Sequence, residues 1–191
     1  EHFNLISALH KSVRNSDVNA SLYWLGRMLE GGADPRYVVR RMLRMASEDI
    51  GLADPRALEQ VAAAALAVEH VGMPECELAL AQSAVYLALA PKSNALYRAY
   101  GAVKGEVHDR PGLAIPLQLR NAPTGLMKEI GYGEGYGYAH DEPGGVADME
   151  CLPSELAEAK FYRPGRDGWE ARIRERLVEI EKRRRSGSSD R

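Results

Sequence analysis

The chain has 191 residues, of which 27% are charged, and its formal net charge at pH 7 is −2. This length fits one ordinary domain with appendages, and the balanced charge argues against a stand-alone nucleic-acid binder. Its two cysteines, Cys76 and Cys151, lie far apart and form no CxxC motif, which is typical of free thiols in a cytoplasmic protein. No apolar run approaches the ~20 residues that cross a bilayer, so we expect no membrane partner.

Helical spacing of apolar residues runs through roughly the first 110 positions. Acidic residues at helix starts, two of them followed by proline, supply the expected caps, and Gly51 supplies a left-handed stop. The sequence predicts six helices in this part, over about residues 3–14, 17–30, 35–50, 57–68, 74–90 and 93–107.

The fifth of these helices is apolar or small on nearly every face. A helix of this kind must be surrounded by protein, so residues 74–90 lie either at the centre of a bundle or at a contact between subunits. The pattern favours the centre of the bundle. The preceding helix, residues 57–68, is rich in alanine, which lets helix axes approach closely.

From Pro111 onward, prolines and glycines interrupt the pattern and leave room for one short helix, from about Pro123 to Gly131. A charged helix follows over 168–185, with i,i+4 pairs expected at Glu170–Arg174, Glu179–Arg183 and Glu181–Arg185. We expect the tail from Ser186 to be disordered.

These elements predict an all-α fold, a multi-helix orthogonal bundle with an irregular segment, residues 111–165, packed on it. Two domains are expected: the helical domain over 1–165, and the charged helix with its disordered tail over 166–191.

No arrangement of residues in the chain is typical of a catalytic, cofactor or metal site. The sequence lacks the Gly-Lys dipeptide of a phosphate-binding loop, and its histidines show no metal-ligand spacing. Glu48 and Asp49 are adjacent carboxylates, but adjacent helical residues point about 100° apart. We therefore expect an ion pair between Glu48 and Arg44 and a capping role for Asp49. A small helical enzyme with a site at Tyr138 and His140 is the least favoured interpretation.

Basic residues on the third helix and near the short helix give a second interpretation, a module that contacts DNA. Phosphate groups would be bound by exposed cations. The positively charged surface is confined to a small area, because carboxylates outnumber the single arginine between residues 51 and 90. The candidate contacts are Arg40, Arg41, Arg44, Arg120 and Lys128. A glycine-tyrosine loop from Gly131 offers rings for base stacking, although a packed turn explains it as well.

Several blocks of sequence, in order, resemble the C-terminal domain of the replication-associated recombination ATPases, the RarA or MgsA family that includes the Werner-helicase-interacting proteins. The blocks are HFNLISALHKSVR at 2–14, ASLYWLGRMLEGG at 20–32, MASEDIGLADP at 45–55, GMPE at 72–75, LAPKSN at 89–94, PLQLRNAPT at 116–124 and AHDEPGG at 139–145.

The resemblance implies a clamp-loader-collar-like helical domain that assembles a AAA+ ATPase into homotetramers. It implies a longer protein, consistent with a chain that starts at Glu1 and not at methionine, whose upstream module binds ATP and Mg²⁺. That protein is expected to act on DNA at stalled forks during replication, recombination and repair. Single-stranded-DNA-binding protein is an implied partner.

Overall fold

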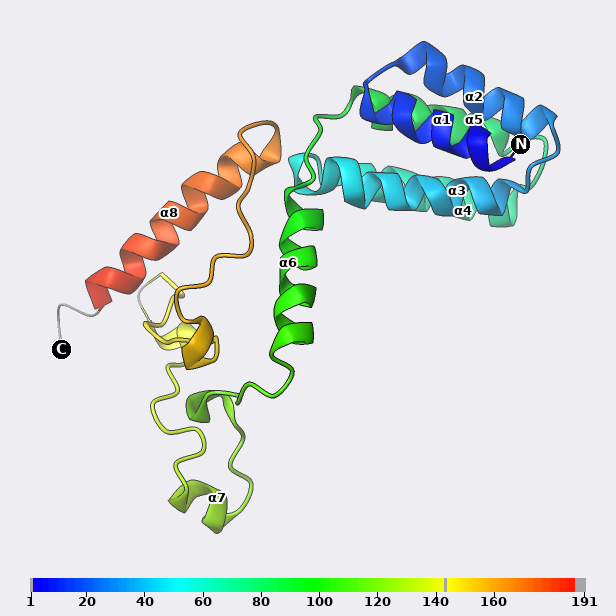
Figure 1. Cartoon of the computed structure of the whole chain (residues 1–191). Helices are drawn as coiled ribbons and strands as arrows, with labels where there is room; N and C mark the ends of the chain where they lie inside the picture. Colours follow the sequence, from blue (N-terminus) through cyan, green and yellow to red (C-terminus); the bar gives the residue numbers. More distant parts are fainter. Residues whose placement is uncertain (1, 143, 188–191) are drawn as a thin grey trace. The chain divides into compact units, whose positions relative to one another are not determined.

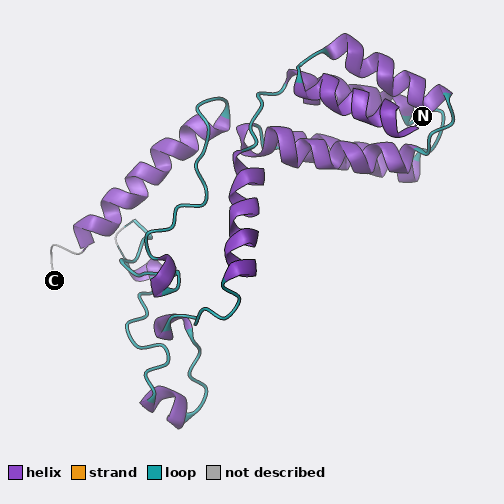
Figure 2. Cartoon of the chain, viewed as in Figure 1, coloured by secondary structure: helices purple, strands orange, loops and turns teal. Residues whose placement is uncertain are grey.

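The computed structural model describes residues 2–142 and 144–187, and its regular elements in these ranges are all helical (Figure 1, Figure 2). The α-helices are α1 (His2–Arg14), α2 (Val18–Glu30), α3 (Pro35–Met45), α4 (Arg56–His70), α5 (Glu77–Leu89), α6 (Ala95–Asp109), α7 (Gly125–Glu129) and α8 (Trp169–Gly187). The prediction of an all-α fold is confirmed. Among the described residues, no helix has the length and apolar character needed to cross a membrane.

The chain forms two compact units. Unit 1 contains described residues 2–101 and 162–173, and unit 2 contains the described parts of 102–161 and 174–187. The helix α6 runs from one unit into the other, and so does α8. The expected domains, 1–165 and 166–191, stay predictions.

Unit 1 is a helical bundle with α5 at its centre, because α5 contacts each of the helices α1 to α4. Leu80, Ala84, Leu87 and Ala88 of α5 are fully buried against the apolar stripes of these neighbours. This confirms the preferred interpretation of residues 74–90 as the bundle core. Burial of one such leucine stabilises the fold by about 2 kcal/mol.

The helix α3 ends in a way that its apolar spacing did not predict. The helix stops at Met45, and residues Ala46–Ile50 form a single wider π-helical turn before the chain reverses. π-helical turns of this kind are frequent at functional sites. The expected glycine stop lies at Gly51, which has a positive φ of 52°, but its ψ of −128° is not that of a left-handed helical residue. A Cβ at this position would lie 3.7 Å from the Ser93 carbonyl oxygen, so the chain passes close to Ser93.

The first turn of α8 packs within unit 1. Gly168, which precedes it, has a φ of 57°, and a Cβ at this position would lie 2.2 Å from the carbonyl oxygen of Ala53 and 2.8 Å from Pro91 Cγ. The backbone approaches its neighbours so closely that only glycine fits. The chain from Tyr162 into α8 is therefore a tightly packed part of this bundle.

Unit 2 has the irregular character expected after Pro111, with α7 and three short 3₁₀ turns at Leu117–Leu119, Ala139–Asp141 and Ser154–Leu156. On α8 the expected pair Glu179–Arg183 is confirmed. Glu181 binds Lys160, at 3.1 Å, and its expected pair with Arg185 stays a prediction. The side chain of Arg185 and residues 188–191 of the expected disordered tail lie outside the described residues, and Ser186 and Gly187 end α8.

Candidate functional site

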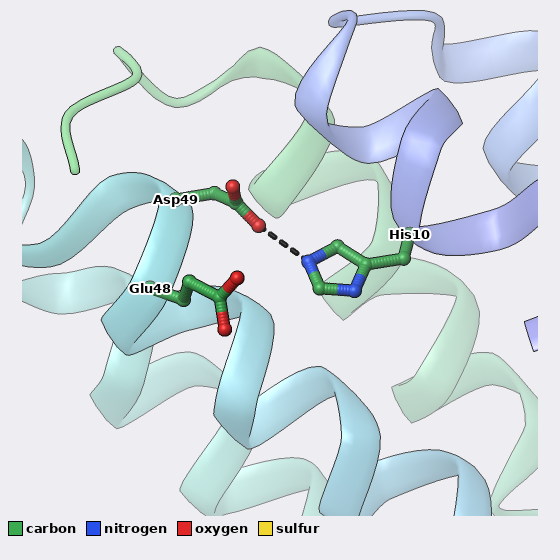
Figure 3. A group of neighbouring side chains, drawn as sticks. All are labelled: His10, Glu48 and Asp49. Carbon is green, nitrogen blue, oxygen red and sulfur yellow. Dashed lines mark hydrogen bonds and ion pairs between the residues drawn. The ribbon is translucent and has the colours of Figure 1, made fainter. Parts of the chain in front are cut away.

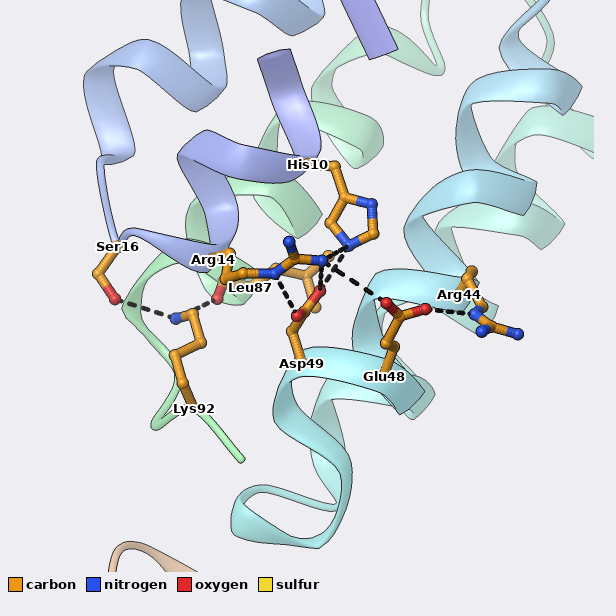
Figure 4. Close-up of polar contacts among 8 residues, drawn as sticks. All are labelled: His10, Arg14, Ser16, Arg44, Glu48, Asp49, Leu87 and Lys92. Atoms are coloured by element: carbon orange, nitrogen blue, oxygen red, sulfur yellow. Dashed lines mark hydrogen bonds and ion pairs between the residues drawn. The ribbon is translucent and has the colours of Figure 1, made fainter. Parts of the chain in front are cut away.

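A buried carboxylate, Asp49, lies where the π-helical turn meets α1. His10 Nε2 lies 2.5 Å from Asp49 Oδ2, within hydrogen-bond distance, and Arg14 Nε donates to Asp49 Oδ1 at 2.6 Å (Figure 3, Figure 4). Asp49 is only 6% exposed. The capping role expected for Asp49 is therefore wrong, because the side chain binds α1 across the bundle and does not bind its own helix end.

The environment of Asp49 stabilises its charged form. Burial alone would raise the pKa of the Asp49 carboxyl, but the hydrogen bonds from His10 and Arg14 together outweigh burial and lower that pKa below its usual value. Loss of one partner strongly destabilises the fold, because it leaves a buried charge without compensation. Asp49 thus connects α1 to the end of α3.

Glu48 lies beside this pair and faces the solvent side. Arg44 Nε donates to Glu48 Oε2 at 2.6 Å, which confirms the expected i,i+4 ion pair, and the Arg14 guanidinium lies 3.6 Å from Glu48 Oε1 (Figure 4). The Arg14 side chain thus lies between the two adjacent carboxylates. We define His10, Arg14, Glu48 and Asp49 as the Asp49 cluster.

Ligand atoms of His10, Glu48 and Asp49 lie within 4.8 Å of one another, a grouping that their spacing in the sequence did not reveal. A guanidinium already occupies the position between these groups, since Arg14 hydrogen-bonds Asp49 and its terminal nitrogen lies 3.1 Å from His10 Nε2. The positive charges of Arg14 and Arg44 balance the two carboxylates. The cluster therefore has the chemistry of a structural ion pair.

The chain that leaves α5 is fixed to the same cluster. The backbone N–H of Ser93 donates to the main-chain oxygen of Asp49 at 2.7 Å. Lys92 Nζ donates to the Leu87, Ala88 and Ala90 carbonyls, at 2.6 to 2.9 Å, and so satisfies the end of α5. Burial lowers the pKa of the Lys92 ammonium, and the Asp49 carboxylate opposes part of that effect.

Glu170, on the first turn of α8, is fully buried in unit 1. Its carboxylate accepts hydrogen bonds from Ser93 Oγ at 2.6 Å, the Gly165 N–H at 2.8 Å and Tyr162 Oη at 2.9 Å. The expected ion pair with Arg174 is wrong, because these donors occupy the carboxylate. Burial and the Glu170 carboxylate raise the pKa of the Tyr162 hydroxyl, which therefore stays protonated and donates.

An open cleft of about 730 Å³ lies within unit 1 beside the Asp49 cluster, and we call it the unit 1 cleft. It is lined by four cations, two carboxylates and polar or aromatic groups: Arg14, Lys92, Arg98, Arg163, Glu48, Asp49, Ser93, Asn94, Ala95, Tyr97, Pro164 and Gly165. The carboxylates and two of the cations already have partners. The remaining arginines, Arg98 and Arg163, are exposed, and they make no side-chain hydrogen bond or ion pair with the residues that the structure describes.

The structure divides the five residues predicted to contact DNA between the two units. On α3, Arg40 is exposed above the Tyr37 ring, while Arg44 binds Glu48 and lies above the Tyr97 ring. Arg41 is half-buried, and its Nε atom has no hydrogen-bond partner among the described residues.

In unit 2, Arg120 donates to the Ile115 carbonyl and to Tyr132 Oη, so its guanidinium has an internal structural role. Lys128 is exposed on α7. DNA contact by the predicted set stays a prediction. Sequence reasoning missed Arg98 and Arg163, which become neighbours of one cleft only through the fold.

Comparison with known proteins gives a consistent family assignment. Residues 15–181 match the family described as "MgsA AAA+ ATPase C terminal". The chain is 54% identical over 176 residues to Replication-associated recombination protein A of Coxiella burnetii, and 51% identical over 177 residues to the Escherichia coli K12 protein of the same name. Each alignment covers 92% of this chain and 40% of the relative.

A eukaryotic relative shows the same likeness. The chain is 52% identical over 162 residues to ATPase WRNIP1 of Dictyostelium discoideum, an alignment that covers 84% of this chain and 18% of that protein. The chain therefore spans well under half the length of the relatives that it matches.

The buried Asp49 pair generates a prediction about stability and pH. Asp49→Asn should lower the free energy of unfolding by about 3 kcal/mol at pH 7, because it leaves His10 and Arg14 without their charged partner. The folded pKa of Asp49 lies below its ordinary value of 3.8, so the stabilisation is fully present above that pH and is lost as the pH falls through the folded value. Urea unfolding should therefore show that the difference in the free energy of unfolding between wild type and variant becomes smaller below about pH 4.

Glu48→Gln is the control, since its partly exposed ion pair contributes at most about 1 kcal/mol. If the loss of unfolding free energy in Asp49→Asn stays constant from pH 7 to the acid range, Asp49 is not the charged partner of His10 and Arg14.

The buried Glu170 carboxylate generates a second prediction. Glu170→Ala removes the acceptor for three hydrogen bonds and should release the chain before α8. Native-state trypsin cleavage after Arg166 should become faster on the order of tenfold. Glu175→Ala, an exposed change on the same helix, is the matched control. Equal cleavage rates for the two variants would show that Glu170 does not hold this segment.

Proposed function

Because the chain belongs to the family of MgsA AAA+ ATPase C-terminal domains, we propose that it is the oligomerisation domain of a longer ATPase that acts in DNA replication, recombination and repair. The names and lengths of the relatives support this, since the chain covers 40% of proteins named for replication-associated recombination. The alternative, a DNA-contacting helical module, uses other surfaces of the same domain.

One surface feature of unit 1 carries the oligomerisation proposal. An open groove of about 400 Å³ lies between α2 and the start of α5, and most of its walls are apolar. Leu78 in this groove is 80% exposed although it belongs to the most apolar helix of the chain, and Leu22 lies opposite it on α2. Exposed apolar surface of this kind is typical of protein contacts. A second copy of the chain is the occupant that we propose.

Four copies of the longer protein would then form a homotetramer through contacts between these domains. In this proposal the chemistry of the longer protein lies outside the chain, with ATP and Mg²⁺ bound by the upstream ATPase module and no catalytic residue contributed by this domain. DNA at stalled forks and single-stranded-DNA-binding protein would be partners of the assembled protein, in the cytoplasm.

The test is the mass of the chain in solution. Light scattering coupled to size exclusion should give about four times the 21.0 kDa mass of one chain. Leu78→Asp should reduce that mass, because a charge in the groove opposes burial of its apolar walls. Leu126→Asp, an exposed leucine of unit 2, is the control and should leave the mass unchanged. A monomeric wild-type chain would remove the oligomerisation proposal.

A further inference from the structure

The unit 1 cleft has a surplus of positive charge that the fold itself does not use. Asp49 is paired with His10 and Arg14, and Glu48 is paired with Arg44. Lys92 points its ammonium into the carbonyl oxygens at the end of α5. The acidic groups of the cleft are therefore already neutralised by these residues.

Two exposed arginines remain, one on each wall of the cleft. Arg98 is on α6, and Arg163 is on the chain that Glu170 fixes before α8. Neither side chain has a hydrogen-bond or ion-pair partner among the described residues. A guanidinium presents donors in a planar fork that matches the paired oxygens of a phosphate group.

The cleft also offers an aromatic surface beside these cations. Tyr97 lines the cleft and is 51% exposed, with the Arg44 guanidinium 5.4 Å from its ring centre. Aromatic rings of this kind hold nucleotide bases by stacking. The cleft volume, about 730 Å³, is within the range of sites that hold a small organic ligand.

We propose that the unit 1 cleft binds a nucleotide phosphate, with Arg98 and Arg163 contacting the phosphate oxygens and Tyr97 stacking on the base. Arg40 lies one turn before Arg44 on α3 and is also exposed, so the positive surface extends beyond the cleft. This extension favours a nucleotide within a strand over a free nucleotide. The proposal does not depend on the oligomeric state of the chain.

The experiment is a fluorescence anisotropy titration of the full chain with a labelled single-stranded oligothymidylate. The variant Arg98→Ala with Arg163→Ala should weaken binding on the order of tenfold. It should also reduce the slope of log affinity against log salt by about 1.4, because each lost phosphate contact on a single strand contributes about 0.7. The charge-matched control, Arg27→Ala with Arg36→Ala, should bind like the wild type.

Competition identifies the source of the phosphate. Displacement of the probe by adenosine monophosphate or inorganic phosphate supports a site for a free nucleotide, whereas displacement only by unlabelled oligonucleotide supports a strand. Circular dichroism checks that the variants fold. The single charge reversal Arg98→Glu is a second test, and it should also weaken binding, because a carboxylate repels the phosphate oxygens. Wild-type binding that is absent, or unchanged in these variants, overturns the proposal. Preferential displacement by a glutamate-rich peptide also overturns it.

Discussion

The buried pairing of Asp49 with α1 is the constraint on which the arrangement of unit 1 depends. Its carboxylate is held by His10 and Arg14, while its main-chain oxygen accepts the N–H of Ser93. One residue therefore joins the first helix, the end of α3 and the connection between α5 and α6. The π-helical turn at Ala46–Ile50 places Asp49 where both contacts are possible, and the adjacent Gly51 lets the chain turn away.

From Ser93 the same chain of contacts continues to α8. Its hydroxyl donates to the buried Glu170 carboxylate, which also binds Tyr162 and the Gly165 backbone. The walls of the unit 1 cleft are thus fixed by two buried carboxylates, each with its own donors. Because Asp49 binds Arg14 and the carbonyl oxygens at the end of α5 bind Lys92, the surplus charge of the cleft lies on Arg98 and Arg163, which are exposed to a ligand.

Local patterns in the sequence predicted most of the helical structure. Asp34 caps α3 by accepting the Arg36 N–H at 2.8 Å, as its position before proline indicated, and the apolar helix α5 lies in the bundle core. Patterns of this kind are visible because each depends on residues within one or two turns of each other. The Glu48–Arg44 pair was predicted for the same reason.

The site itself depends on contacts over long distances in the sequence. Asp49 lies 39 positions from His10, and Glu170 lies 77 positions from Ser93, so no spacing rule connects them. Glu170 is an example. Its helical spacing predicted an ion pair with Arg174, but in the fold its carboxylate accepts hydrogen bonds from Ser93, Tyr162 and Gly165. The π-helical turn at the end of α3 was not predicted, because the buried residues Ala46 and Ile50 are four positions apart, a spacing that also fits an α-helix.

The amide of Ser93 reports most directly on whether Asp49 organises this region. This N–H donates to the main-chain oxygen of Asp49 over 2.7 Å, so it can exchange with solvent only when the connection between α5 and α6 separates from the π-helical turn. Native-state hydrogen exchange followed by NMR should therefore show this amide exchanging as slowly as those of the buried Leu87 and Ala88. Exchange of the Ser93 amide at the rate of an exposed loop would contradict the central role of Asp49.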